Sequence, residues 1–130
     1  MGYPRQAWEH IAPMPEMRDI LAYFQRLAHE IPWSAALCTT AFIEAEVVEI
    51  SRTVGRALAT HYGCRPHWGA MNYQVHEEVE GEEAGQTESA ILQYIQTAEE
   101  RHAAEQSMRA MHRLLEAYAQ GLRRDYCARN

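Results

Sequence analysis

The sequence predicts an all-α protein, an antiparallel helical bundle of about four main helices. Apolar residues recur at helical spacing in four long segments, and no run shows the alternation of a β-strand. Pro, Gly and polar residues fall between these segments, and the short connections make sequential helices antiparallel neighbours. With 130 residues, of which 47% are hydrophobic, the chain is expected to form one domain. Its bundle is expected to span residues 16–126.

The N-terminal segment, residues 1–15, is expected to be irregular because its prolines prevent a continuous helix. A first helix is predicted for residues 16–31. It ends before Pro32, since a residue that precedes proline is driven out of the helical conformation. Its apolar stripe consists of Ile20, Phe24, Leu27 and Ile31.

The second helix is predicted for residues 34–62, with Ser34 as its N-cap and Gly63 as a left-handed stop. A third helix is predicted for residues 67–95, in which Gly81 and Gly85 permit a bend. The fourth is predicted for residues 97–125. Its stripe has the spacing of a bundle core and consists of Ala104, Met108, Met111, Leu115, Tyr118 and Leu122.

Composition excludes several classes of function. The formal net charge is −6, which argues against a nucleic-acid ligand. No stretch is long and apolar enough to span a membrane, and the first residues lack the apolar region of a secretory signal. The three cysteines, Cys38, Cys64 and Cys127, are odd in number and form no CxxC pair. Together these features predict a cytoplasmic protein. Cys38 is expected in the core, and a reactive thiol at Cys64 is an alternative to a structural role.

The third helix contains an acidic stretch, HEEVEGEE, from residue 76 to residue 83. At 100° per residue, Glu80 and Glu83 fall within about 40° of His76 on the helix circumference. Apolar residues flank this arc, which indicates that it faces the interior. The remaining glutamates of the stretch point elsewhere and are expected to be solvated.

The second helix repeats this pattern. Glu44 shares a face with apolar residues that include Leu37, Ala41, Val48 and Leu58. An isolated buried carboxylate is costly unless it is paired, protonated or bound to a metal. Carboxylates and a histidine from facing helices are the ligands of di-iron and di-manganese bundles. The sequence therefore predicts a metal site made of Glu44, His76, Glu80 and Glu83, with iron, or else manganese, as its metal.

A second interpretation needs no metal. A glutamate within an apolar stripe is often paired with an arginine across the bundle, and Arg52, Arg56 and Arg101 are available for this. Likewise, a single histidine on such a face is often a hydrogen-bonded core residue.

Two segments, AFIEAEVVEISRTVGRALATHYG and NYQVHEEVEGEEAGQTESAIL, resemble the heme-oxygenase-like di-iron oxidases, whose superfamily includes the TenA and PqqC proteins. In that family a glutamate precedes a helix end by about eighteen residues, as Glu44 precedes Tyr62. The next helix carries a histidine and an acidic residue at i+4, which His76 and Glu80 match. Glu83 stands where the family has a second histidine.

The resemblance covers about residues 30–125, the C-terminal half of the family's fold. It implies O2-dependent oxidation of a small organic substrate, such as an amino acid or a fatty acid. Since the family's first helices supply further ligands and cover the core, the half-length chain is expected to form a homodimer or to bind a partner chain.

Two other functions are open. One is a non-catalytic helical module, a partner subunit or small-ligand binder that has lost the metal chemistry. The other is a metal-free TenA-like hydrolase, for which the expected cysteine nucleophile is missing.

Overall fold

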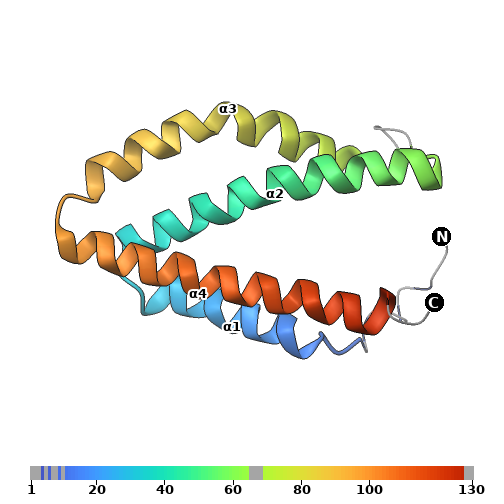
Figure 1. The fold of residues 1–130 in the computed structure, drawn as a ribbon, viewed down its shortest axis with the longest axis horizontal. Helices are drawn as coiled ribbons and strands as arrows, with labels where there is room; N and C mark the ends of the chain where they lie inside the picture. The colour runs from blue at the N-terminus through green and yellow to red at the C-terminus, as the bar shows by residue number, and fades with distance from the viewer. Residues whose placement is uncertain (1–3, 5, 7–8, 10, 65–68, 128–130) are drawn as a thin grey trace. The chain divides into compact units, whose positions relative to one another are not determined.

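The computed structural model describes residues 4, 6, 9, 11–64 and 69–127, and the side chains of 77–86 and 88 lie outside this description. Helices make up 85% of the described residues, which contain no strand. The all-α class is therefore confirmed. Four main helices follow one another, as Figure 1 shows: α1 (Pro15–His29), α2 (Trp33–Tyr62), α3 (Met71–Tyr94) and α4 (Ala98–Leu122). A π-helical turn, η2 (Arg123–Cys127), follows α4.

The ends of α1 and α2 differ in part from the prediction. α1 ends at His29, two residues earlier than expected. Ser34 is not the N-cap of α2: Pro32 occupies that position, and no side chain caps the helix. Since a proline has its φ angle already set for a helix start, the helix begins directly after it, and Ser34 lies buried in the first turn. The left-handed stop at Gly63 is confirmed, with a φ of 64°.

The ends of α3 and α4 also differ in part from the prediction. Residues 67 and 68, in the predicted start of the third helix, lie outside the described residues, and α3 begins at Met71. It continues through Gly81 and Gly85, and its ribbon is visibly curved (Figure 1). The fourth helix was predicted to continue to residue 125, whereas the α-helical hydrogen bonding ends at Leu122 and a π-turn takes over.

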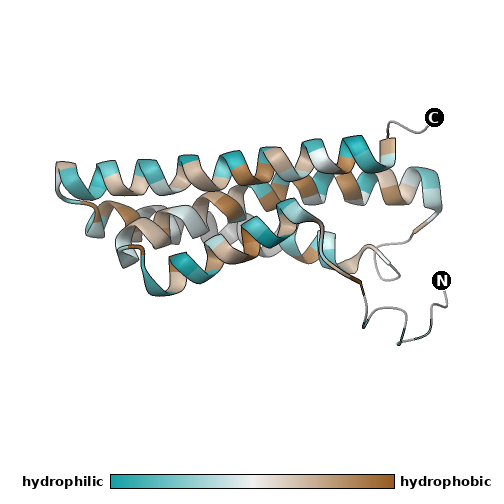
Figure 2. Cartoon of the chain, turned by 90° about the horizontal axis from the view of Figure 1, so that it is seen from below, coloured by the Kyte–Doolittle hydropathy of each residue, from teal (hydrophilic) through white to brown (hydrophobic). Residues whose placement is uncertain are grey.

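α1 and α4 are the most amphipathic helices, and Figure 2 shows apolar positions recurring along the helices between polar ones. The predicted stripe of α4 is confirmed at Ala104 and Met111, which are buried. In α1 the stripe includes Tyr23 instead of Phe24: Tyr23 is buried and Phe24 is 42% exposed. Among the described residues, no helix combines the length and the apolar character that a membrane crossing requires.

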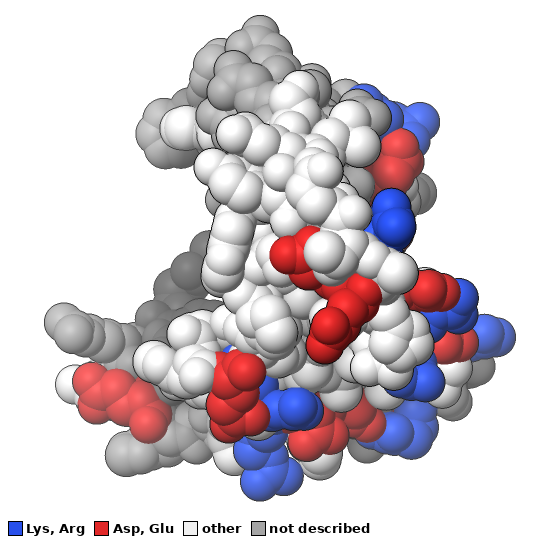
Figure 3. All heavy atoms as spheres, turned by 90° about the vertical axis from the view of Figure 1, so that its left-hand side faces the viewer, with Lys and Arg blue, Asp and Glu red and all other residues white. Residues whose placement is uncertain are grey.

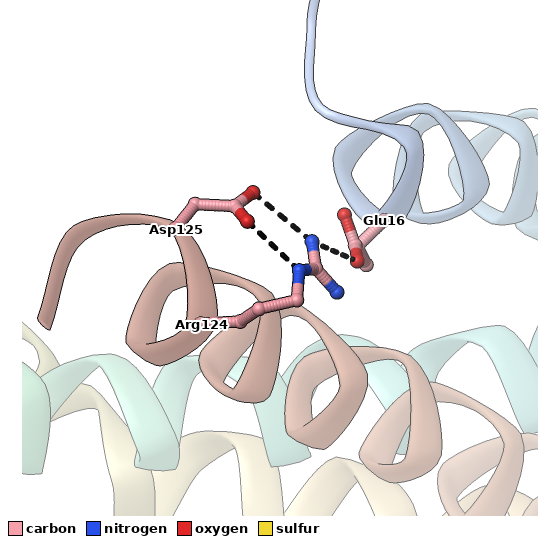
Figure 4. A network of polar contacts seen from close by, with 3 residues as sticks. All are labelled: Glu16, Arg124 and Asp125. Carbon is pink, nitrogen blue, oxygen red and sulfur yellow. Dashed lines mark hydrogen bonds and ion pairs between the residues drawn. The ribbon is translucent and has the colours of Figure 1, made fainter. Parts of the chain in front are cut away.

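The chain divides into two compact units, residues 1–31 with 109–130, and residues 32–108. In the first unit, Glu16 at the start of α1 accepts a hydrogen bond of 3.0 Å from Arg124, which also binds Asp125 (Figure 4). Gly121 lies close to this ion pair: a Cβ at this position would lie 2.9 Å from the carboxylate of Glu16, so a larger residue would have to displace that side chain. A backbone hydrogen bond at Glu16 itself, together with the hydrogen bond from Arg124, lowers the pKa of that carboxyl group.

The second unit contains α2, α3 and the first part of α4. α2 and α3 pack against each other and run in opposite directions (Figure 1). At one end of the pair, the rings of Trp33 and Tyr94 meet edge to face, with centroids 4.7 Å apart. Inside the unit, Thr39 of α2 and Ser107 of α4 form a buried hydrogen bond of 2.7 Å.

Candidate functional site

The pairing of α2 with α3 determines which of the predicted ligands lie at the same level. Near the connection of the two helices, a Cβ on Gly55 would lie 3.6 Å from the Cβ of Tyr73. At the far end, Trp33 contacts Tyr94. Both contacts indicate the same antiparallel register. In this register, a residue later in α2 lies opposite a residue earlier in α3.

This register places Glu44 level with residues 83 and 84 of α3. Glu80 lies one helical turn away, and His76 lies eight residues away, roughly 12 Å along the axis at 1.5 Å per residue. His76 is instead level with Arg52. The backbone positions of Glu44, Glu80 and Glu83 therefore lie at similar levels along the helix pair, and that of His76 lies toward the connection of the helices.

The burial of the predicted ligands is known in part. The side chain of Glu44 is exposed in the chain, although its apolar neighbours Ala41 and Val48 are half-buried. The expected burial of Glu44 is therefore not found. His76 is half-buried. Glu80 and Glu83 belong to α3, but their side chains are outside the description, and the described side chains alone contain no group of three potential ligands.

The alternative in which Glu44 is paired with an arginine is not found among the described residues. Arg52 instead binds Glu49 of its own helix, with 2.8 Å between Nη1 and Oε1. Arg56 donates a hydrogen bond of 3.1 Å from its Nε to the carbonyl of Arg52. The exposed carboxylate of Glu44 therefore remains available to a ligand.

The sequence reasoning missed a cavity of about 230 Å³ near the connection of α2 and α3. It is lined by the turn at Cys64 and by residues of both helices, among them Arg52, Arg56, Ala59 and Tyr73. The two arginines lie one turn apart on α2, a spacing that could have indicated an anion site. Cys38, in contrast, is buried as predicted, and its burial raises the pKa of the thiol.

On the face drawn in Figure 3, acidic and basic side chains are interspersed and do not form a single basic patch. Comparison with protein-family models, curated proteins and solved structures finds no match to this chain.

Proposed function

We propose that this chain is a metal-binding helical protein of the heme-oxygenase-like di-iron oxidase type. In this proposal Glu44 of α2 and His76, Glu80 and Glu83 of α3 hold iron, or else manganese. The reaction is the O2-dependent oxidation of a small organic substrate. The cytoplasmic location expected from the unpaired cysteines is part of the same proposal.

The antiparallel contact of α2 with α3 is the observation that carries this proposal. It joins the two helices that contain all four residues, and its register has Glu44 level with Glu83. The carboxylate of Glu44 is exposed and pairs with no described arginine, so it is accessible to a metal ion.

Each residue has a separate task in this proposal. Three carboxylates and one imidazole are hard and borderline donors, which suit iron and manganese in the absence of thiolate ligands. The carboxylates neutralise the positive charge of the metal ion. Because Glu44 belongs to α2 and the other ligands belong to α3, the bound ion would link the two helices. Bound iron would supply the reaction with O2. His76, which is offset along the helix, is the ligand that needs the largest adjustment of the helix pair.

The test is iron content after anaerobic reconstitution of the purified chain. About one or two iron atoms per chain are expected, as in other bundles of this kind. Glu44→Ala should abolish loading, and His76→Ala should reduce it, the smaller effect following from its offset.

Matched controls separate ligand loss from general damage. Glu46→Ala removes an exposed carboxylate two residues away on the same helix, and His61→Ala removes an exposed histidine near its end. Both should load iron as the original chain does. If Glu44→Ala and His76→Ala also retain the full iron content, the proposed site is wrong.

A second candidate is a non-catalytic helical module that associates with a copy of itself or with a partner chain. A specific observation favours it: large apolar side chains at both ends of α2 and α3 are exposed, among them Trp33 at 61% and Leu92 at 69%. Such side chains are typical of a surface that a further helix covers. Light scattering should then give the mass of a dimer for the purified chain. A dimer that binds no iron would favour this candidate over the oxidase.

A further inference from the structure

The cavity between α2 and α3 is separate from the proposed metal site, because none of the four proposed ligands lines it. It lies beside the turn at Cys64, where the last third of α2 faces the first turn of α3. All the residues that line it belong to one compact unit.

The size and the walls of the cavity limit its occupant. Gly55, Ala59, Ala70 and the ring of Tyr73 contribute a largely apolar lining. Gly55 matters because it leaves open the space beside Tyr73 that a larger side chain would fill. A volume of about 230 Å³ equals that of roughly eight water molecules at about 30 Å³ each. A molecule of the size of benzoate fits this volume.

The charge at the cavity is positive. Arg52 and Arg56 both line it, and none of the described lining residues is acidic. Arg52 is neutralised by Glu49 at 2.8 Å. Arg56 forms no ion pair with a described residue, and its Nε is held by the carbonyl of Arg52 at 3.1 Å. This hydrogen bond orients the guanidinium group and leaves its terminal N–H groups for a ligand.

We infer that this cavity binds a small monocarboxylate with a compact apolar body. The carboxylate lies against the terminal N–H groups of Arg56, which form the planar fork that two carboxylate oxygens match. The apolar body lies against Tyr73 and the small residues of α2. Gln74, at the cavity wall, adds a polar contact beside the carboxylate.

Calorimetric titration of the metal-free chain with benzoate tests this inference. Saturable binding is expected, and binding of benzamide, the neutral analogue, should be at least about tenfold weaker, since it cannot form charge-assisted hydrogen bonds with the guanidinium group. Arg56→Gln should weaken benzoate binding by a similar factor. Arg101→Gln, which removes the same charge from an exposed position on α4, should leave it unchanged.

A second variant tests the cavity without removing an arginine. Ala59 is exposed and helical, so Ala59→Glu is compatible with the fold and places a carboxylate one turn from Arg56. This variant should lose benzoate binding while its circular dichroism spectrum stays that of a folded helical protein.

Several outcomes would overturn the inference. They are equal binding of benzoate and benzamide, full binding by Arg56→Gln, and the absence of saturable binding by a folded chain. Inorganic phosphate that binds as tightly as benzoate would show a general anion site in place of a carboxylate site. Because the titration uses metal-free protein, its result is independent of iron loading, and either proposal can fail alone.

Discussion

Thr39 and Ser107 show what a single buried pair contributes. Their hydroxyl oxygens lie 2.7 Å apart, and the side chain of Thr39 is fully buried. Thr39 also contacts the carbonyl of Ala35 at 2.9 Å. A hydrogen bond of this kind stabilises a protein by about 1 kcal/mol, whereas removing one partner alone adds the cost of desolvating the other.

Thr39→Val should therefore lower the free energy of unfolding by about 1 to 3 kcal/mol, measured by urea denaturation. In the double variant Thr39→Val with Ser107→Ala, the loss should be smaller than the sum of the two single losses, because no hydroxyl is then left facing an apolar group. Strict additivity would contradict a direct interaction between the two residues.

At the scale of the element, the start of α4 is defined by its own sequence. Thr97 and Glu100 form a capping box: the Glu100 N–H donates to the hydroxyl of Thr97 at 3.1 Å, and the Glu100 carboxylate accepts from the Thr97 N–H at 2.8 Å. The carboxylate accepts hydrogen bonds from the N–H and the hydroxyl of Thr97 and from the N–H of Gln96, and these lower the pKa of Glu100. The pattern T-x-x-E in the sequence was a signal for this cap.

The cap makes the free energy of unfolding depend on pH, and its contribution decreases in acid. Because Glu100 has a lower pKa in the folded chain than in the unfolded chain, its contribution is present above the ordinary carboxyl pKa. It is lost as the pH falls through the folded-state value. Thr97→Ala should lower the free energy of unfolding by about 1 kcal/mol at neutral pH and by less in acid.

Denaturation at neutral and at acidic pH measures this difference. Thr53→Ala is the matched control, because Thr53 is exposed within α2 and caps no helix. Its effect should be small and the same at both pH values. An equal loss for Thr97→Ala at both pH values would show that Glu100 does not take part in the cap.

At the scale of the whole molecule, the exposed apolar side chains of the helices matter most. Ile50, Met71 and Val75 are each about half exposed. Covering such surface in a dimer stabilises the chain by about 25 cal/mol per Å². If a second copy provides the cover, folding is linked to association, and stability depends on protein concentration.

The midpoint of thermal unfolding should then rise over a hundredfold increase in protein concentration, together with a dimer mass in light scattering. A constant midpoint and a monomer mass throughout would contradict the homodimer. The exposed apolar side chains would then be expected to bind a separate partner chain.

The sequence by itself determined the all-α class, the positions of the helices and the left-handed stop at Gly63. These depend on periodicity and on glycine and proline, whose effects are local along the chain. For the same reason most helix ends fell within a few residues of their predicted positions. The sequence also singled out Glu44 and His76 as candidate ligands, and their role as a metal site stays a prediction.

Only the tertiary structure decided which residue of a neighbouring pair is buried, as with Tyr23 and Phe24, and that Glu44 is exposed. It also set the register that makes Glu44 level with Glu83 and His76 level with Arg52, and it formed the cavity beside Arg56. The physical reason is common to all of these. They depend on how one helix packs against another, through contacts between residues far apart in the chain, which helical periodicity does not specify.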